Sequence, residues 1–441
     1  MALITPFRAL RYDPARVQPA VVVTQPYDKI TPAMQDGYYS ASPHNLVRII
    51  LGKSEPADSE RHNVYTRAGG FFDSWRRDGI FRQDAEPSLY TYTQTFTPPG
   101  STTPHERRGF IALGRIEEYT AGVVHRHEQT LSKPKVDRLN LLRATRAHFG
   151  QIFMLYSDSG EIDSLLDVPA PPDVEIQDEY GVAHLLWRVA DPEITAAVRA
   201  KMRDQRLIIA DGHHRYETAL AYRNERRESA GSAKSNGGGS DAATLAPWEF
   251  VMMTFVNMNS PGLVVLPTHR LVHSLPDFSP ALLADGARKY FNLEEVDCPV
   301  DSDRASKILQ QAGHAGTALL AATRNKCFLL HTPKATGANV FGNLSLRQQA
   351  LDVVQLHKCL LENVLGLSEE SIRNQENISY LRDASEALAR VREGQANVAF
   401  LMNPCRIDQV RDMALAGEVM PQKSTDFYPK LLTGLTIYAL E

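Results

Sequence analysis

The hydrophobic pattern of the chain changes most sharply after a run of four apolar residues, Leu207 to Ala210. This run is typical of a buried strand, and it stops at the polar turn Asp211-Gly212. From His214 onward, apolar and long side chains recur at helical spacing, at Tyr216, Ala219, Leu220 and Arg223. The pattern therefore predicts a strand that passes through a short polar turn directly into a helix.

The rest of the chain predicts both strands and helices. Leu89 to Phe96 alternates between apolar or aromatic residues and Thr or Gln, and we expect it to pair with a second strand at 110–116 across a long loop. A buried strand is expected at 250–256, and a helix with one basic face at 136–149. Beyond Leu275 we expect alternating helices (281–290, 304–312, 351–365, 385–391) and short strands (318–322, 328–331, 398–401).

These elements predict an α+β (mixed α/β) fold with two domains. We expect residues 1–275 to form a region that carries the Asp211 turn, and residues 276–441 to form a second, smaller α/β domain. The stretch 229–246 is rich in Ser, Gly, Ala and Asn, and it contains almost nothing apolar to bury. We expect it to be a flexible loop on the first region.

Composition and charge exclude several classes of protein. The 441 residues are 43% hydrophobic, which is typical of a folded protein of several domains rather than a small stapled module. Lys and Arg total 48 against 52 Asp and Glu, so the bulk charge of -4 does not attract nucleic acid or an anionic membrane. No apolar run approaches the ~20 residues of a membrane-spanning helix, and the first residues do not resemble a signal peptide. We therefore expect a cytoplasmic protein with no nucleic-acid or membrane partner.

The four cysteines, Cys298, Cys327, Cys359 and Cys405, are scattered and include no C-x-x-C pair. This spacing argues against a zinc knuckle and predicts reduced thiols. We therefore expect no redox chemistry.

The turn from Asp211 to Arg215 is suited to binding phosphate. A strand-to-helix junction directs unpaired backbone N–H groups and the positive end of the helix dipole at one point. His213, His214 and Arg215 add donors suited to phosphate oxygens. Asp211 is suited to hold a magnesium ion that bridges the phosphates, or to accept a proton from an attacking hydroxyl, with Glu217 or Glu128 as the alternative base.

Two other interpretations of this turn stand beside the functional one. In the structural interpretation, Asp211 caps the helix, Gly212 supplies an unusual backbone angle, and the histidines are surface residues. In the other, the histidines bind zinc, but adjacent helical residues point about 100° apart and the chain contains no H-E-x-x-H motif. Five consecutive polar residues exceed what a helix cap needs, which favours the functional interpretation.

Further candidate groups lie elsewhere in the chain. A second cluster contains His127, Glu128, Lys135 and Arg138, although dense mixed charge is also typical of a solvated surface. Near the C-terminus, two prolines frame the loop Lys423-Ser424-Thr425, which presents an ammonium and two hydroxyls suited to an anion. Asp28 and the pair His269-Arg270 are shorter candidates, each of which a structural role also explains.

Common nucleotide-binding motifs are absent from the sequence. Gly52-Lys53-Ser54 resembles the end of a Walker loop, but Val47 stands where that motif needs a glycine. No G-x-G-x-x-G follows a strand, and neither the G-x-S-x-G motif nor the kinase signatures occur. If the chain handles phosphate, it does so without the common nucleotide folds.

Four strings of the sequence resemble a known family. They are IADGHHRYETAL, HEQTLSKPKVDRLNLLRATRAHFGQIFMLY, LPTHRLV and GEVMPQKSTDFYPKLLTGL, and the resemblance spans essentially the whole chain. They look like the bacterial domain-of-unknown-function family 1015 (DUF1015), and the Asp-Gly-His-His-Arg core is similar to that of the ParB-like free serine kinases. The resemblance implies a ParB/serine-kinase-like catalytic region that phosphorylates free L-serine from a nucleotide or pyrophosphate.

Carried onto this chain, the resemblance implies a phosphate and magnesium site at Asp211, Gly212, His213, His214 and Arg215. It also implies that the Lys423-Ser424-Thr425 loop and His269-Arg270 are neighbours of that site. The leading hypothesis is a Mg2+-dependent kinase that transfers phosphate from ATP, ADP or pyrophosphate to L-serine. A non-catalytic ParB-like nucleotide-binding switch and a metal-dependent phosphohydrolase are the alternatives.

Overall fold

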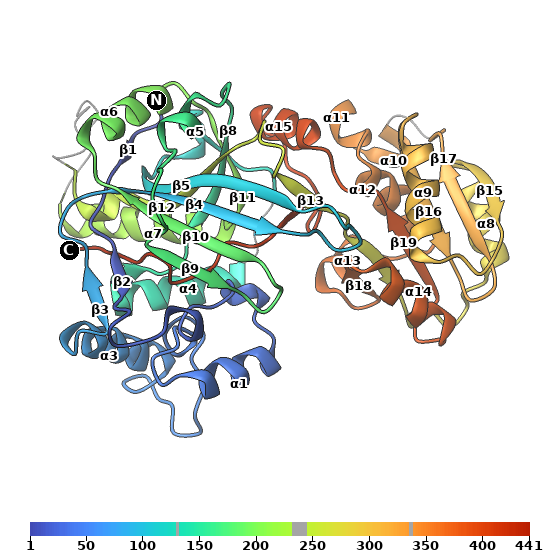
Figure 1. The fold of residues 1–441 in the computed structure, drawn as a ribbon. Coiled ribbons are helices and arrows are strands. Elements are labelled where there is room, and N and C mark those ends of the chain that lie inside the picture. The colour runs from blue at the N-terminus through green and yellow to red at the C-terminus, as the bar shows by residue number, and fades with distance from the viewer. Residues whose placement is uncertain (129–131, 232–244, 335–337) are drawn as a thin grey trace. The chain divides into compact units, whose positions relative to one another are not determined.

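The computed structural model describes residues 1–128, 132–231, 245–334 and 338–441, which divide into two compact units (Figure 1). Unit 1 comprises residues 1–126, 130–264 and 429–441, and unit 2 comprises residues 127–129 and 265–428. The units divide at 264/265, whereas we expected a boundary near Leu275, and the last residues of the chain belong to unit 1. Most of the expected flexible loop at 229–246 lies outside the described residues.

Unit 1 is built on a nine-stranded sheet. Its strands, in spatial order, are β6 (Val124–His125), β11 (Leu207–Asp211), β8 (Ile152–Tyr156), β12 (Phe250–Asn257), β5 (His105–Arg115), β4 (Leu89–Phe96), β10 (Ala183–Val189) and β9 (Val174–Gln177), and β1 (Ile4–Thr5) also pairs with β5. The pairs β11–β6 and β12–β8 are parallel, and the other pairs are antiparallel. The sheet is therefore mixed.

Two hydrophobic cores stabilise unit 1. One face of the large sheet packs against α5 (Glu161–Leu165), α6 (Pro192–Met202) and α7 (His213–Ser229), through buried residues such as Val198 and Tyr216. The second core joins the shorter elements β2 (Leu10–Tyr12), α2 (Val47–Ile50), α3 (Val64–Arg77), β3 (Phe81–Gln83), α4 (Ser132–Thr145) and β7 (Ala147–His148). Ile437, in the C-terminal segment, is buried in this second core. Two further helical segments of unit 1 are η2 (Tyr27–Lys29) and α1 (Pro32–Ala41).

Unit 2 is built on a six-stranded antiparallel sheet. Its order is β15 (Asn292–Val296), β17 (Cys327–His331), β16 (Ala318–Ala322), β19 (Val398–Met402), β14 (His269–Val272) and β18 (Ile378–Leu381). The helices α9 (Ser302–Gly313) and α14 (Ala384–Arg392) pack on one face, through residues such as Leu309 and Leu388. The other elements of unit 2 are α8 (Pro280–Ala287), α10 (Ala338–Phe341), α11 (Leu346–Gln349), α12 (Asp352–Gln355), a π-helix (Leu356–Glu362), α13 (Glu369–Asn374) and α15 (Ile407–Leu415). Strands β13 (Val264–Leu266) and β20 (Asp426–Tyr428) form a separate two-stranded sheet.

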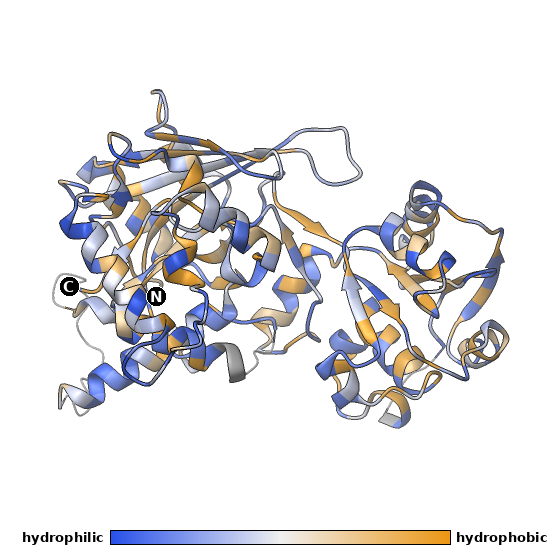
Figure 2. Cartoon of the chain, turned by 90° about the horizontal axis from the view of Figure 1, so that it is seen from below, coloured by the Kyte–Doolittle hydropathy of each residue, from blue (hydrophilic) through white to orange (hydrophobic). Residues whose placement is uncertain are grey.

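The mixed α/β fold class predicted from the sequence is confirmed. Figure 2 shows hydrophobic positions along the strands and a mixture of hydrophobic and hydrophilic positions along the helices, as the sequence pattern requires. The predicted strand and helix around Asp211 correspond to β11 and α7, and the predicted hairpin corresponds to β4 and β5. No helix in the described parts of the chain is both long and apolar enough to span a bilayer.

Two predicted helices end earlier than their patterns indicated. Instead of continuing to Phe149, α4 ends at Thr145, and β7 follows and pairs with β21 (Tyr438–Ala439). The apolar residues Ala147 and Phe149 are buried in the second core, so tertiary packing explains why they carried an apparently helical pattern. The helix expected at 351–365 consists of α12 followed by the π-helix at Leu356–Glu362.

The prediction of four reduced cysteines is wrong, because the structure contains a disulfide between Cys298 and Cys327. The antiparallel register of β15 and β17 places Val296 opposite Cys327. Cys298 lies two residues further along, and its Cα is 6.1 Å from that of Cys327, within the usual range for a disulfide. This proximity arises from strand pairing, which the cysteine spacing alone does not reveal. Cys359 and Cys405 are free thiols.

Candidate active site

The backbone at the end of β11 explains the sequence of the turn. The pairing register with β8 shifts between Ile209 and Asp211, an irregularity of the kind that redirects a side chain at a strand end. Gly212 has φ 92°, in the left-handed region that favours glycine, and a Cβ there would lie 3.0 Å from the Arg215 guanidinium. The backbone N–H of Gly212 donates to Oδ1 of Asp211 at 2.9 Å, and α7 begins at the next residue.

Positive charges surround the carboxylate of Asp211. The Lys430 ammonium lies 3.4 Å from Oδ2 of Asp211, and Nη2 of Arg215 lies 3.9 Å from the same oxygen. Burial alone raises the pKa of Asp211, but the charges of Lys430, Arg215 and Lys29 outweigh that effect and hold the pKa well below its ordinary value. Asp211 is therefore an ionised carboxylate at neutral pH, inside a cluster in which cations outnumber it.

The C-terminal segment of the chain brings Lys430 to this position. The side-chain amide of Gln94 donates to the Lys430 carbonyl at 2.9 Å, and Nη2 of Arg107 donates to the Pro429 carbonyl at 2.5 Å. Both donors lie on the β4–β5 hairpin of unit 1. These hydrogen bonds fix the backbone beside Lys430, so the ammonium is held by the sheet rather than by a free loop.

Arg107 adds a second, deeper cation. Its side chain is 1% exposed, and its guanidinium lies 4.8 Å from the centroid of the Phe153 ring and donates to Oε1 of Gln94. Burial lowers the pKa of Arg107 to about 10, and the negative charge of Asp211 acts against that shift. Arg107 therefore stays protonated at neutral pH and contributes positive potential to the site.

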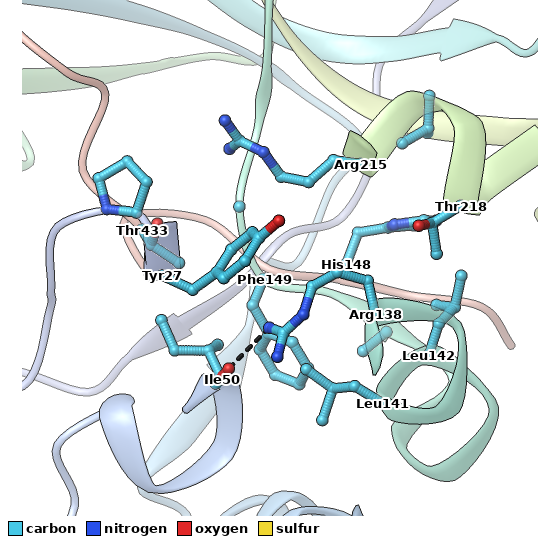
Figure 3. A pocket seen from close by; sticks show the side chains of 14 residues that line it. Tyr27, Ile50, Arg138, Leu141, Leu142, His148, Phe149, Arg215, Thr218 and Thr433 are labelled. Carbon is cyan, nitrogen blue, oxygen red and sulfur yellow. Dashed lines mark hydrogen bonds between the residues drawn. The ribbon is translucent and has the colours of Figure 1, made fainter. Parts of the chain in front are cut away.

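Arg215 lines a small cavity next to the turn (Figure 3). The cavity measures about 70 Å3 and is also lined by Tyr27, Arg138 and Thr433. Figure 3 shows the Tyr27 ring between the guanidinium groups of Arg215 and Arg138, and the Arg138 guanidinium lies 4.2 Å from the ring centroid. Nη1 of Arg215 donates to the Gln151 carbonyl at 2.5 Å. The cavity therefore presents two guanidinium groups beside the strand-to-helix junction.

The two histidines of the motif occupy the first turn of α7. His213 is 8% exposed, and its charged form acts on Asp211 to lower the pKa of that carboxyl. His214 is half-buried, and its carbonyl accepts the hydroxyl hydrogen bond of Thr218 at 2.8 Å. The first turn of the helix thus begins with two imidazoles next to Asp211 and Arg215.

Glu217 and Lys135 form an ion pair with each other. Arg126 adds a second cation, with Nη1 3.5 Å from Oε1 of Glu217. Two cations engage Glu217, as two engage Asp211, but the Glu217 side chain is 10% exposed against 26% for Asp211. Asp211 is therefore the more accessible acceptor of the two. Asp28, another candidate, is an exposed residue of η2, beside Tyr27.

The remaining candidates lie in unit 2. The Lys423 carbonyl accepts from Nη2 of Arg270 at 3.0 Å, and the Lys423 N–H donates to Oε1 of Glu128 at 3.2 Å. Nε2 of His127 lies 2.8 Å from Oγ1 of Thr425. The hydroxyl of Ser424 donates to the Pro421 carbonyl at 2.5 Å. Nδ1 of His269 accepts from the Met402 N–H at 3.3 Å. The structure therefore brings His127, Glu128 and Arg270 together around the Lys423-Ser424-Thr425 loop, whereas the hydrogen bond of His269 runs to Met402.

Sequence reasoning missed four residues of the unit 1 site: Lys29, Arg107, Gln151 and Lys430. Lys430 lies within the string GEVMPQKSTDFYPKLLTGL, but neighbouring residues gave no sign that it meets Asp211. Gln151 is fully buried, and the oxygen and nitrogen of its side-chain amide have no hydrogen-bond partner among the described residues. Buried polar side chains without a partner are uncommon in proteins, so Gln151 stands out among the residues beside Arg215.

The described residues contain no group of three or more His, Cys, Asp and Glu side chains that could hold a metal ion. Asp211 is the carboxylate at the junction, and cations surround it. Magnesium is commonly bound by one or two carboxylates together with waters and substrate phosphates. The residues therefore fit a magnesium ion that arrives with a phosphate ligand, rather than a metal centre made by the protein alone.

Comparison with known proteins identifies one family and several distant structural similarities. The family described as "Protein of unknown function (DUF1015)" matches residues 4–354. A mutant free serine kinase in complex with AMP is similar over 71% of this chain and 89% of its own, with 13% identity and a TM-score of 0.34. A conserved hypothetical protein from Pyrococcus furiosus is similar over 71% and 92%, with 13% identity and a TM-score of 0.33. SbnI with a C-terminal truncation, from Staphylococcus aureus, is similar over 74% and 87%, with 10% identity and a TM-score of 0.34. No curated protein matches the chain.

Proposed function

Because the chain belongs to the DUF1015 family, and because the end of β11 collects cations around one carboxylate, we propose that it transfers a phosphoryl group to a small hydroxyl compound. The observation that carries the proposal is the cluster of Lys430, Arg215, Lys29 and Arg107 around Asp211. Phosphoryl transfer depends on positioning and on stabilising negative charge, which such a cluster provides. The resemblance of the Asp211 to Arg215 motif to ParB-like free serine kinases makes free L-serine the acceptor to test first.

The cations bind and orient the phosphate donor. Arg215 comes from α7 and Lys430 from the C-terminal segment, which is distant in sequence. Both cations approach the same oxygen of Asp211, Oδ2. The oxygens of a polyphosphate bound in this cluster accept hydrogen bonds from Arg215, from Lys430 and from the backbone N–H groups at the N-terminus of α7. Pyrophosphate and the phosphates of ATP or ADP share this chemistry.

Asp211 orients the attacking hydroxyl. In the transfer, the hydroxyl oxygen forms a bond to phosphorus, the bond from phosphorus to the bridging oxygen breaks, and the leaving phosphate departs with that electron pair. Asp211 accepts the hydrogen bond of the hydroxyl, and the proton passes to solvent. Its lowered pKa makes it a weak base, which suits a loose transition state in which little proton transfer is needed.

Magnesium is part of the proposal through Asp211. The ion would be held by this carboxylate and by the phosphates of the donor, and it would neutralise charge on the transferring group. Every other contribution comes from the chain itself. Arg215 and Lys430 bind phosphate oxygens, and the backbone of the α7 N-terminus adds N–H donors.

The test is phosphorus NMR of purified protein with Mg2+ and L-serine, with ATP, ADP and pyrophosphate supplied in separate samples. We expect O-phosphoserine to form with at least one donor, and to be lost in Asp211→Asn. Asp73→Asn, which removes an exposed carboxylate from α3, is the matched control and should retain activity. Free phosphate without phosphoserine would instead identify a phosphohydrolase, and binding without turnover would identify a nucleotide-binding switch.

A further inference from the structure

Unit 2 contains a cavity of about 330 Å3, lined by residues that the proposed phosphoryl transfer does not require. Its wall includes Arg270 from β14, Asp352 from α12, and Asn403 and Cys405 from the segment between β19 and α15. This volume lies within the usual range of small-ligand pockets. All the lining residues belong to the described part of unit 2.

Arg270 places a buried positive charge on this wall. The side chain is 1% exposed, and its Nη1 and Nη2 donate to the carbonyls of Thr268 and Lys423 and to the sulfur of Met402. Its Nε has no hydrogen-bond partner, and no carboxylate of the described residues forms an ion pair with it. Burial lowers the pKa of Arg270 to about 10, so the group is charged at neutral pH. The negative charge of Glu128 acts on Arg270 without forming an ion pair, and the hydrogen-bond acceptors of the guanidinium are all neutral. A buried charge of this kind is costly unless an anion binds beside it.

Asp352 places a negative charge on the same cavity. It is the first residue of α12, and it receives hydrogen bonds from the Thr317 side chain and the Ala318 backbone. Burial raises the pKa of Asp352 to about 6, so most of the population is ionised at neutral pH. Among the described residues, no cation forms an ion pair with its carboxylate, and the charge of Arg406 acts on it without one.

We propose that this cavity binds a small zwitterion, an amino acid or a compound with the same pair of charges, with its acidic group at Arg270 and its ammonium group at Asp352. A simple anion would satisfy Arg270 and be repelled by Asp352, and a simple amine would have the opposite difficulty. A zwitterion offers a counter-charge to both residues. Asn403 and Ser424, also in the wall, supply neutral hydrogen-bonding groups for the rest of the ligand.

Cys405 provides a reporter that is specific to this cavity. Its thiol is partly exposed and lies in the wall, whereas Cys359, the other free thiol, is buried and is not part of the wall. Burial raises the pKa of the Cys405 thiol to about 12, so alkylation by N-ethylmaleimide is slow but can be followed by mass spectrometry of the Cys405 peptide. Occupancy of the cavity should slow this alkylation further.

The experiment compares L-serine with two probes that each lack one of its charges, ethanolamine and 3-hydroxypropionate, and with inorganic phosphate. We expect L-serine at saturation to slow alkylation of Cys405 at least tenfold, and the other three probes to have less than a twofold effect. Protection should disappear in Asp352→Asn, which keeps the shape of the wall, and in Arg270→Gln. Arg411→Gln, an exposed residue of α15, should keep it.

Because Arg270 also holds the Lys423 backbone, Asp352→Asn carries the test if Arg270→Gln fails to fold. Failure of L-serine to protect Cys405 overturns the proposal, as does equal protection by a probe with one charge or by phosphate. Protection that survives Asp352→Asn also overturns it. The readout does not depend on the unit 1 site. In Arg215→Gln, L-serine should therefore protect Cys405 as strongly as it does in the wild type.

Discussion

Nζ of Lys430 lies 3.4 Å from Oδ2 of Asp211, so the C-terminal segment completes a charge cluster that begins at the end of β11. Burial favours the protonated form of Asp211, and Lys430 makes the largest of the cationic contributions that oppose this effect. With Lys430, Arg215 and Lys29 in place, the carboxylate is ionised and the cluster as a whole is positive. A positive pocket at a helix N-terminus is suited to a polyphosphate.

Replacing Lys430 should move the pH dependence of catalysis. Among the cations, Lys430 lowers the pKa of Asp211 the most. The pKa of Asp211 should therefore rise in Lys430→Gln. Activity that requires ionised Asp211 is retained above its pKa and lost below it, so the acid limb of kcat/KM should move to higher pH. A pH profile of the wild type and the variant measures this shift. An acid limb at the same pH in both proteins would show that Lys430 does not control Asp211.

Replacing Arg215 should lower the rate without unfolding the protein. Arg215→Gln removes one donor from the transferring phosphate, and the loss of such a donor costs ~10² to 10³ in kcat. The Arg215 side chain donates a hydrogen bond to the Gln151 carbonyl, and the loss of one such bond should change Tm by only a few degrees. Steady-state kinetics with L-serine and the active donor measure the effect. Arg77→Gln, at an exposed arginine of α3, is the control and should match the wild type.

Glu217 and Asp211 should differ in their effect on turnover. Glu217 is held by Lys135 and Arg126, and Glu217→Gln should change kcat by less than roughly threefold because its carboxylate is engaged by these cations and takes no part in the transfer. Asp211→Asn should reduce kcat by at least ~10² if the carboxylate orients the hydroxyl. Turnover of the two variants under the same conditions makes the comparison. A larger loss in Glu217→Gln than in Asp211→Asn would transfer the role of base to Glu217.

The stability of unit 1 should depend on the protonation of His148. Burial lowers the pKa of His148 to about 4, below the ordinary value of 6.5, so the unfolded chain binds the proton more readily between these values. The free energy of unfolding should therefore fall as the pH drops below about 6.5, by roughly 2 to 3 kcal/mol from this residue at pH 4.5. His148→Phe keeps a ring against Tyr438 and removes the titration, so its stability should fall less. Denaturant unfolding at pH 7 and pH 4.5 tests this, and an equal fall in both proteins would contradict it.

The disulfide between Cys298 and Cys327 determines how many thiols should react before and after reduction of the protein. Protein that is denatured without reductant should show two reactive thiols, from Cys359 and Cys405, and four after reduction. Thiol titration under the two conditions measures these numbers. Four thiols before reduction would mean that Cys298 and Cys327 are not bonded in the isolated protein.

The local features of the site could be predicted from the sequence, because they depend on neighbouring residues. The apolar run before Asp211 and the helical spacing after His214 predicted the junction of β11 and α7, and Gly212 adopts the positive φ that the turn needs. The groups that come from distant segments could not be predicted. Lys430 and Arg107 meet Asp211 only through the pairing of β4 with β5 and the return of the C-terminal segment to unit 1.

The candidates in unit 2 also combine motifs that the sequence revealed with contacts between distant segments that it did not reveal. His269-Arg270 and the Lys423-Ser424-Thr425 loop were each recognised as motifs, and the structure brings them together within unit 2. Arg270 donates to the Lys423 carbonyl, and the Lys423 N–H donates to Glu128, two contacts with the loop backbone that residue type does not specify. The approach of Cys298 to Cys327 likewise follows from the register of β15 and β17 and not from the spacing of the two cysteines.

The most direct test of the central claim, that the end of β11 collects oxyanions, is calorimetric titration of pyrophosphate with Mg2+ into wild-type protein, Arg215→Gln and Arg77→Gln. We predict that the wild type and Arg77→Gln bind pyrophosphate with the same affinity, and that Arg215→Gln binds it at least tenfold more weakly. Equal affinity in all three proteins, or no binding by the wild type, would contradict the claim.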